Sequence, residues 1–478
     1  MGPILPWIDT VTWTDSITWS WTLIIYCFGL AAAIDAIWNG RTSQGTLAWV
    51  VALTFIPFIS LPLYLFFGSR KFHGYKKARK AGSKALKRLN QLQLFSDQDY
   101  QSKIKSTPVI PLEKLAHLPQ TEQNEIKLLI NGEQTFTHIF QSIEAAKHTI
   151  LVQFYIVNDD QLGQRLQQAL IKKSQQAVTV YFLYDEIGSS QLNRFFLKPM
   201  TDAGIHCSRF NHFQILRHWQ INFRNHRKLI IIDGKTCFIG GHNIGDEYLS
   251  RDPSLGLWRD THLQIDGPAT LAAQLSFVED WHWAQDKIPT LNWQAYTSNQ
   301  NSKVLIIPGG PADTVETISL SFVQLILQAQ QRLWIATPYF IPDLKVMGAL
   351  QLAALKNIDI RIILPKKTDN PIVDLAMRSY IAELSQLGIQ FYQYNAGFMH
   401  QKVMLIDQEA SYIGSANLDN RSLRINFELN ALIECKQLAS QVEQMLNQDL
   451  LHCRPYPEQK HLLQKLLAKA ARLLSPIL

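Results

Sequence analysis

The hydrophobic positions of this chain follow one pattern before residue 70 and another after residue 120. Before residue 70, apolar residues dominate two stretches, 17–38 and 47–67. The second stretch holds 21 residues without a charge, about the length of a helix that crosses the hydrocarbon core of a bilayer. Pro57 and Pro62 lie inside it and predict kinks, which membrane helices tolerate. The pattern predicts a transmembrane helical hairpin over residues 1–70.

After residue 120, short β-branched runs alternate with helical patterns, and the order repeats once. The predicted strands lie at 149–157, 178–184, 229–233 and 262–265, then at 304–307, 333–337, 358–364, 389–394, 403–407 and 429–434. The predicted helices lie at 162–177, 191–203 and 268–284, then at 314–331, 343–356 and 370–387. A polar break at 286–302 separates the halves. The fold class is therefore α/β, with two similar lobes, 126–290 and 300–455, that form a pseudo-twofold sandwich.

The flanks of the apolar stretches bear on topology. No Lys or Arg precedes residue 17, so a cleaved signal peptide is disfavoured. Between residues 70 and 88 the chain carries nine basic residues and no acidic residue. Because positive charge stays on the cytoplasmic side, this run predicts a cytoplasmic catalytic part, although Arg41 alone marks the loop between the spans. The basic run is attracted to anionic lipid headgroups or, alternatively, forms a solvated helix face. It belongs to a basic juxtamembrane segment and connector over residues 71–125.

Composition narrows the possible partners. The net charge of +7 fits an anionic membrane or a nucleic acid, and the position of the basic run directly after an apolar segment favours the membrane. Five cysteines, odd in number and without a C-x-x-C pair, indicate reduced packing residues and not disulfides or metal ligands.

One motif, His-x-Lys-x-x-x-x-Asp, occurs twice with the same downstream tail. The two copies are His226, Lys228 and Asp233, and His400, Lys402 and Asp407. In each, Gly follows fourteen residues after the His and Asn seventeen after it, which gives Gly240 with Asn243 and Gly414 with Asn417. A match repeated at this scale indicates a duplicated structural unit.

Strand geometry assigns roles within each copy. His and Lys are two residues apart at the start of a predicted strand, so their side chains project to one face. The Asp has the opposite parity and lies at the strand end, which gives it a supporting role. Each Asn follows a Gly-Gly or Gly-Ser turn that lets backbone approach a ligand, and its amide can donate to an anionic oxygen.

The duplicated inventory suits phosphoryl chemistry. If the lobes pack face to face, one His attacks a phosphorus and the other protonates the leaving oxygen. Two Lys and two Asn then supply positive charge and donors for the transition state. This chemistry requires no metal or other cofactor, and the sequence has no clustered Cys, His or carboxylate set that suggests one.

With these residues the chain resembles the phospholipase D superfamily, whose mark is the paired motif, and within it the membrane-anchored bacterial cardiolipin synthases. The likeness extends over nearly the whole chain and includes 153–155, 240–248, 337–343, 414–422, 426–428 and 471–476. It implies an inner-membrane, multi-pass phosphatidyltransferase that acts on phosphatidylglycerol among anionic lipids, without nucleic acid as a partner. Oligomeric state stays open.

The resemblance also implies residue roles. Phosphatidylglycerol donates its phosphatidyl group to His226, glycerol leaves, and a second phosphatidylglycerol accepts the group while His400 serves as acid and then base. The superfamily orients each His with an acidic residue, and Asp260 and Glu428 stand where those residues fall. Asp260 lies 34 residues after its motif His and Glu428 lies 28 after its own, so the offsets differ.

Several alternatives remain at this stage. Residues 456–478 predict a basic amphipathic helix that either binds a lipid surface or packs on the catalytic lobe. Water as acceptor would make a phospholipase D, and another alcohol a different transferase. A nuclease and a lipid-binding scaffold with an inactive site are the further alternatives. The two predicted spans disfavour the nuclease, and the intact motifs disfavour the scaffold.

Overall fold

The computed structural model describes residues 13–40, 43–68, 75, 109–210, 222–458 and 461–475. The basic run and most of the predicted connector lie outside this part of the chain. The helices up to residue 68 belong to one compact unit, and the elements from residue 109 onward belong to a second.

The N-terminal unit consists of α1 (Trp13–Asn39), α2 (Ser43–Phe55) and α3 (Pro57–Phe67). Residues 19–39 form a helix long and apolar enough to cross a membrane. The predicted stretch 47–67 is divided between α2 and α3 at Pro57, which has no amide hydrogen to donate and starts α3. The kink predicted at Pro57 is confirmed, whereas Pro62 stays within α3. The 13 residues of α2 rise about 20 Å, less than the hydrocarbon thickness, so α1 alone has spanning length among the helices that the structure describes.

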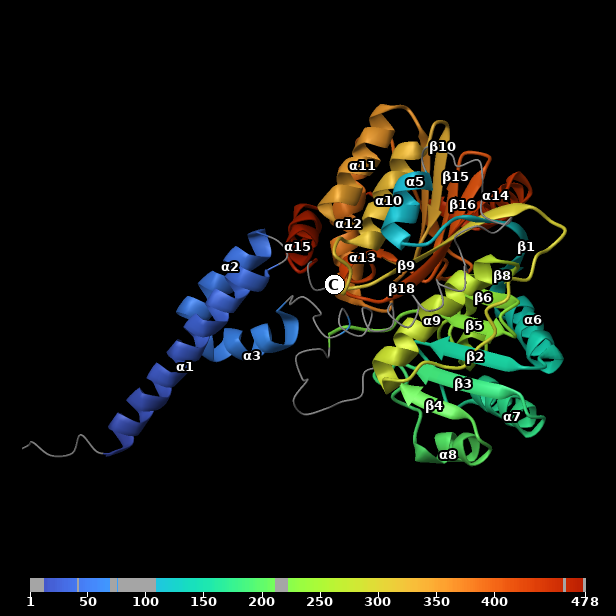
Figure 1. The fold of residues 1–478 in the computed structure, drawn as a ribbon. Coiled ribbons are helices and arrows are strands. Elements are labelled where there is room, and N and C mark those ends of the chain that lie inside the picture. Colours follow the sequence, from blue (N-terminus) through green and yellow to red (C-terminus); the bar gives the residue numbers. More distant parts are fainter. Residues whose placement is uncertain are drawn as a thin grey trace, which may run out of the picture. The chain divides into compact units, whose positions relative to one another are not determined.

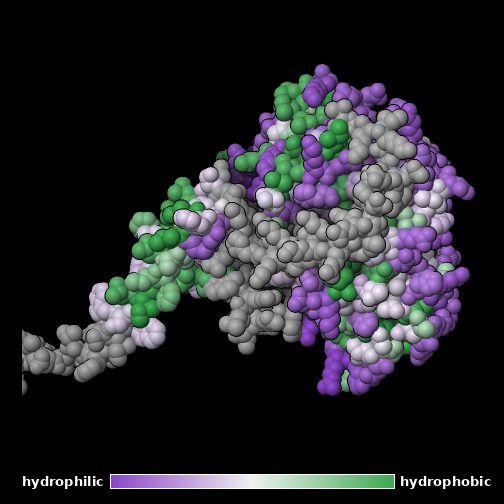
Figure 2. All heavy atoms as spheres, in the orientation of Figure 1, coloured by the Kyte–Doolittle hydropathy of each residue, from purple (hydrophilic) through white to green (hydrophobic). Residues whose placement is uncertain are grey.

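Small residues let these three helices approach closely. A Cβ at Gly29 would lie 2.7 Å from the carbonyl oxygen of Leu53 and 2.8 Å from Pro57 Cβ. Ala32, Ala33 and Ala36 lie on the same face of α1 as Gly29 and are buried. The Tyr64 hydroxyl donates to Asp35 at 2.7 Å. Larger apolar side chains such as Leu23 and Phe28 remain exposed along α1, as expected of a lipid-facing surface (Figure 2).

The second unit contains two α/β lobes (Figure 1). The helix α5 (Val109–Ala116) precedes the first lobe in sequence but packs against elements of the second lobe. The first lobe comprises β1 (Thr121–Ile130), α6 (Asn131–Ala145), β2 (Thr149–Phe154), α7 (Gln161–Gln175), β3 (Thr179–Tyr184), α8 (Arg194–Asp202), β4 (His206–Arg209), β5 (Leu229–Ile232), β6 (Thr236–Gly240), the short 3-10 helix η2 (Asp246–Leu249), β7 (Leu257–Arg259), β8 (Thr261–Asp266) and α9 (Ala269–Gln285).

The second lobe repeats this order. It comprises β9 (Ser302–Gly309), α10 (Thr317–Gln328), β10 (Arg332–Ala336), β11 (Phe340–Ile341), α11 (Leu344–Leu355), β12 (Asp359–Pro365), α12 (Pro371–Ser385), β13 (Gln390–Tyr394), β14 (Gly397–Met399), β15 (Val403–Ile406), β16 (Ala410–Gly414), β17 (Leu418–Asp419), α13 (Asn420–Arg424), β18 (Glu428–Glu434), α14 (Lys436–Leu451), β19 (Cys453–Pro455) and α15 (Leu462–Arg472).

Corresponding strands pair in the same way in the two lobes. β2 pairs in parallel with β3, as β10 does with β12, and antiparallel with β5, as β10 does with β15. The hairpins β5–β6 and β15–β16 are likewise equivalent. The prediction of two similar α/β lobes is therefore confirmed.

The lobes join through β1, a strand that the sequence pattern did not predict, which lies between the predicted strands β8 and β9. β1 pairs antiparallel with both β8 and β9, and this links the two halves in one 15-stranded order. The register of β1 against β9 shifts between Thr121 and Asn124. Beyond this seam, β16 contacts β6 and β8, and β18 contacts β6, so the central strands of the two lobes also lie against each other. The segments that carry the two motifs therefore lie at the interface between the lobes.

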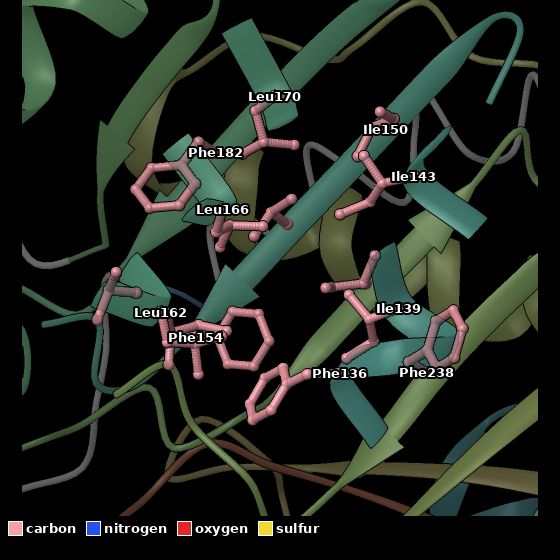
Figure 3. Close-up of a cluster of buried hydrophobic side chains, with 14 of the residues drawn as sticks. Phe136, Ile139, Ile143, Ile150, Phe154, Leu162, Leu166, Leu170, Phe182 and Phe238 are labelled. Carbon is pink, nitrogen blue, oxygen red and sulfur yellow. The ribbon is translucent and has the colours of Figure 1, made fainter. Parts of the chain in front are cut away.

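Alternating side chains hold the first lobe together (Figure 3). Ile150, Val152 and Phe154 project from one face of β2. They meet Phe136, Ile139 and Ile143 of α6 and Leu162, Leu166 and Leu170 of α7, which recur at helical spacing. The carboxylate of Asp160 caps α7 by accepting from the Gly163 amide at 2.9 Å. This layer fixes β2 and, through it, β5 with the first motif.

Candidate functional site

Each motif histidine lies just before a central strand and is held by the other lobe. The His226 amide donates to the Phe427 carbonyl at 2.9 Å, and the His400 amide donates to the Arg259 carbonyl at 2.8 Å. Phe427 and Arg259 immediately precede Glu428 and Asp260. The backbone pairing therefore brings each acidic residue beside the histidine of the opposite lobe.

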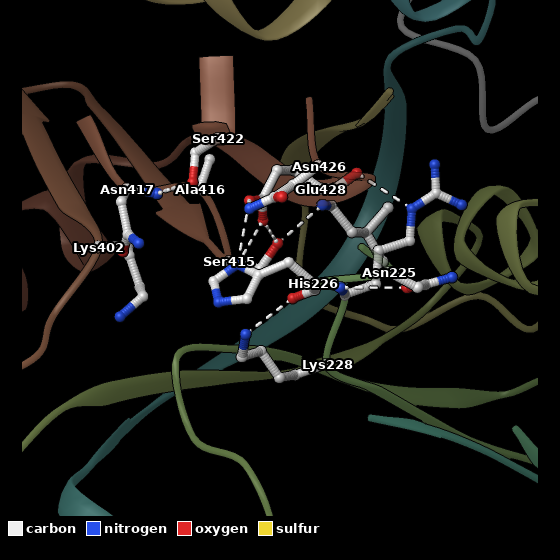
Figure 4. Close-up of polar contacts among 12 residues, drawn as sticks. Asn225, His226, Lys228, Lys402, Ser415, Ala416, Asn417, Ser422, Asn426 and Glu428 are labelled. Carbon is white, nitrogen blue, oxygen red and sulfur yellow. Dashed lines mark hydrogen bonds and ion pairs between the residues drawn. The ribbon is translucent and has the colours of Figure 1, made fainter. Parts of the chain in front are cut away.

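The side chains follow this exchange. His226 Nδ1 lies 3.0 Å from both carboxylate oxygens of Glu428 (Figure 4), and His400 Nδ1 lies 2.6 Å from Asp260 Oδ2. Asp260 and Glu428 are thus in contact with histidines, as the resemblance implied, but the partners are crossed between lobes. The unequal offsets of 34 and 28 residues along the sequence describe same-lobe distances, which this geometry does not use.

The turn after each hairpin fits the carboxylate beside it. A Cβ at Gly241 would lie 2.0 Å from Asp260 Oδ1, so this position has no room for a side chain. At the equivalent position Ser415 donates to Glu428 Oε2 at 2.5 Å. The Gly-Gly and Gly-Ser versions of the tail therefore correspond to two ways of holding the acidic residue.

Both motif lysines are buried beside their histidines. Lys228 Nζ donates to the His226 carbonyl at 2.8 Å, and Lys402 Nζ donates to the His400 carbonyl at 2.5 Å. Burial lowers the pKa of Lys402 to about 8 and lowers that of Lys228 well below its usual value. A bound anion favours the charged form of a nearby amine, so these two lysines can hold an anionic group.

Burial also sets the protonation of the imidazoles. It lowers the pKa of His226 to about 4 and that of His400 to about 3, and the charge of the adjacent lysine adds to both shifts. Burial alone would raise the pKa of Asp260 and Glu428, but the neighbouring lysines and histidines hold both below their usual values. At neutral pH each carboxylate accepts from Nδ1–H, which leaves the lone pair on Nε2.

Charges of one motif act on the other. Lys402 lowers the pKa of His226, and Lys228 lowers that of His400. The crossed contacts give the geometric reason, since His226 lies against Glu428 of the second lobe and His400 lies against Asp260 of the first. The motifs therefore contribute to one centre.

Aromatic rings surround the histidines. The Tyr155 ring centroid lies 5.1 Å from that of His226, and the Trp258 and Phe398 centroids lie 4.8 and 5.8 Å from that of His400. These walls displace water, which strengthens the electrostatic interactions inside. Tyr155 belongs to the 153–155 segment of the family resemblance, but its position beside His226 was not predicted.

A second layer of buried polar groups was also missed. Arg227 Nη1 donates to Asp280 at 2.7 Å, and Gln153 and Asn225 donate to the same carboxylate at 2.6 and 2.9 Å. Asp449 of the second lobe likewise accepts from Gln401 of its own lobe and from Arg259 of the first lobe. The available signal was a polar residue between His and Lys, which strand parity directs to the opposite face.

Asp233 and Asp407 lie at the far ends of their strands. Asp233 accepts from the amides of Lys147, His148 and Thr149 at 2.8–2.9 Å, and Asp407 accepts from the amides of residues 330–332. Both have positive φ, 54° and 51°. Their contacts fit the supporting role inferred from parity and place them outside the group that touches a substrate.

The two asparagines have different surroundings. Asn243 donates to the Tyr248 hydroxyl at 2.8 Å and accepts from the Ile156 amide at 3.2 Å, so its amide already holds the turn in place. The Asn417 backbone amide donates to Ser422 Oγ at 3.1 Å, and the buried Asn417 Oδ1 has no partner among the described residues. Substrate binding by either amide stays a prediction.

Comparison with known proteins agrees with this architecture. A family model described as "Cardiolipin synthase, PLD-like domain" matches residues 139–271 and 322–450, and one described as "Phospholipase D-nuclease N-terminal" matches residues 28–69. Cardiolipin synthase A of Pseudomonas putida is 42% identical over 468 residues, covering 95% of this chain and 97% of the relative. Cardiolipin synthase A of Pseudomonas entomophila is 41% identical over 473 residues, with the same coverage. The crystal structure of a phosphatidylserine synthase from Haemophilus influenzae, 17% identical, matches with a TM-score of 0.59 over 78% of this chain and 100% of its own, which supports the fold.

Proposed function

This chain belongs to the cardiolipin synthase family of the phospholipase D superfamily, and from that membership we propose that it transfers a phosphatidyl group from one phosphatidylglycerol to another and releases glycerol. It is a phosphatidyltransferase of the phospholipase D type. The observation that carries the proposal is the crossed pairing, in which two neutral imidazoles are each oriented by the carboxylate of the other lobe.

The first half-reaction forms a phosphohistidine. His226 Nε2 attacks the phosphorus of phosphatidylglycerol, the bond from phosphorus to the glycerol oxygen breaks, and His400 gives that oxygen a proton. Glu428 stabilises the positive charge that His226 gains. In the second half-reaction His400 takes the proton from the hydroxyl of another phosphatidylglycerol, whose oxygen attacks phosphorus and frees His226.

The acid role of His400 requires a proton, which the low pKa of its imidazole opposes. A bound phosphodiester carries a negative charge, which favours the charged form of any base close to it. Substrate binding therefore raises the pKa of His400 and partly neutralises Lys228 and Lys402. The same two ammonium groups stabilise the additional charge of the transition state.

The proposal extends to cellular placement. The spanning helix of residues 19–39 supports membrane association. The basic run after residue 70 supports a cytoplasmic orientation of the catalytic lobes at the inner membrane, with anionic lipids as partners and without nucleic acid.

Product analysis with a single lipid tests the function. Purified full-length protein supplied with phosphatidylglycerol alone is expected to form cardiolipin and glycerol in equal amounts, also after exhaustive chelation of metals. Accumulation of phosphatidic acid would identify water as the acceptor, and strict metal dependence would contradict the mechanism.

Substitution of the nucleophile separates catalysis from binding. His226→Ala is expected to lower turnover by at least about 10³-fold without loss of fold. Lys228→Ala is expected to weaken it severely. His148→Ala, at an exposed histidine, is the matched control and should retain activity. Normal turnover in both motif variants would exclude this site.

A further inference from the structure

α15 is attached to the second lobe by its small and basic residues. Ala468 and Ala471 are its buried residues, and the helix contacts α12 (Figure 1). Arg472 donates to Glu383 at 2.6 Å, and its guanidinium lies 4.1 Å from the centroid of the Tyr380 ring. The helix thus has a defined attachment to the catalytic unit, as one of the two sequence-based alternatives expected.

The large apolar side chains of this segment point away from that attachment. Six leucines are 42–83% exposed, namely Leu462, Leu463, Leu466, Leu467, Leu473 and Leu474. A helix of a water-soluble domain normally buries its apolar face against the core and leaves its small or polar face outside. Here that arrangement is reversed. Contiguous exposed leucines on an ordered helix mark a surface that binds something apolar.

Charge indicates what covers these leucines, which we call the leucine face. The sequence from 459 to 478 contains Lys460, Lys465, Lys469 and Arg472, and neither Asp nor Glu. A second copy of the same basic segment would bring like charges together. An anionic bilayer offers hydrocarbon to the leucines and phosphates to the lysines. We propose that the leucine face of α15 docks into the surface of an anionic lipid bilayer.

The end of this segment is connected to a motif tail. Asn420 Nδ2 donates to the Ser475 carbonyl at 3.0 Å, and the Tyr380 hydroxyl donates to Ser475 Oγ at 3.0 Å. Asn420 begins α13, three residues after Asn417. A docked α15 therefore holds the second motif's tail close to lipid headgroups, which shortens the path of a lipid phosphate to the histidines. This docking is independent of which alcohol accepts the phosphatidyl group.

Photochemical labelling tests the docking without any need for turnover. The full-length protein is reconstituted in vesicles of phosphatidylglycerol that contain a phospholipid with a diazirine in its acyl chain, and adducts are located by mass spectrometry. We expect adducts on peptides covering 461–475 and none on the peptide with Leu451, which is 75% exposed at the end of α14. If α1 is labelled in the same sample and α15 carries no adducts, the proposal is overturned.

A matched pair of substitutions supplies the functional readout. Leu466→Glu is expected to raise the mole fraction of phosphatidylglycerol needed for half-maximal rate about tenfold, with kcat and the thermal midpoint little changed. Leu451→Glu should behave as the unaltered protein. Unchanged half-saturation in Leu466→Glu would contradict lipid docking. If Leu466→Glu has half the molecular mass of the unaltered protein in detergent, the leucine face would instead serve self-association. Failure of cardiolipin formation in the unaltered protein would concern only the proposed function.

Discussion

At the scale of residues, the crossed histidine–carboxylate pairs decide what the site can do. Each carboxylate is fully buried and ionised, and each holds its imidazole with Nδ1–H toward itself. The ring nitrogen aimed at a phosphorus is therefore Nε2 in both histidines. The pairing also makes each half of the reaction depend on both lobes.

Glu428→Gln tests this dependence. The amide has no charge to stabilise the imidazolium, and its nitrogen can donate to Nδ1 and move the ring proton to Nε2. We expect kcat to fall by on the order of 10²- to 10⁴-fold. Glu434→Gln, at the other end of β18, is the matched control because Glu434 contacts Gln120 and not a motif histidine. Equal activity of the two variants would show that Glu428 does not orient His226.

The reacting residues were predictable from sequence because a duplicated spacing survives without knowledge of the fold. Their partners were not. Distance along the chain assigns Glu428 to His400, whereas the hydrogen bond joins it to His226. Asp280 and Asp449 lie in helices far from the motifs in sequence, and no spacing rule connects them to the residues between His and Lys.

At the scale of elements, the aspartate of each motif fastens the end of one strand to the start of another. Asp233 follows β5 and accepts from three successive amides at the start of β2. Its φ of 54° is a conformation that Asp and Asn tolerate better than other residues. This contact sets the register in which β5 presents His226 and Lys228.

Asp233→Ala is expected to lower stability by about 2 kcal/mol, because three amides lose their acceptor and the left-handed backbone loses a tolerant residue. Asp233→Asn keeps the backbone preference and should lose less. The thermal unfolding midpoints of the two variants and the unaltered protein are compared in detergent. The kcat of each is measured at saturating lipid, at a temperature well below these midpoints. Loss of turnover with an unchanged midpoint would instead place this carboxylate in the chemistry.

Periodicity located most of the central strands and several of the helices that cover them, since continuous apolar runs and helical spacing are strong signals. It did not predict α6 or α14. It missed β1, which starts with the polar run Thr121, Glu122, Gln123 and Asn124. It also missed β7 and β14, which have three residues each. In the apolar stretch 47–67, hydropathy alone gave one span, whereas Pro57 divides it into two shorter helices.

At the scale of the whole molecule, duplication converts two incomplete half-sites into one centre. Each lobe carries a histidine and a lysine but holds the carboxylate for the other lobe's histidine. The sequence could predict two lobes and a pseudo-twofold relation. It could not predict the β1–β9 seam or the exchange, since both depend on how the lobes associate.

Locating the covalent intermediate tests whether both motifs act on one phosphodiester. The reaction with phosphatidylglycerol is quenched in the steady state, and peptides that carry a phosphatidyl group on histidine are identified and quantified by mass spectrometry. A single shared centre should carry no more than one phosphatidyl group per chain, on His226, and none in His226→Ala. Adducts on His226 and His400 together in a single chain, or undiminished cardiolipin formation without any adduct, would contradict it.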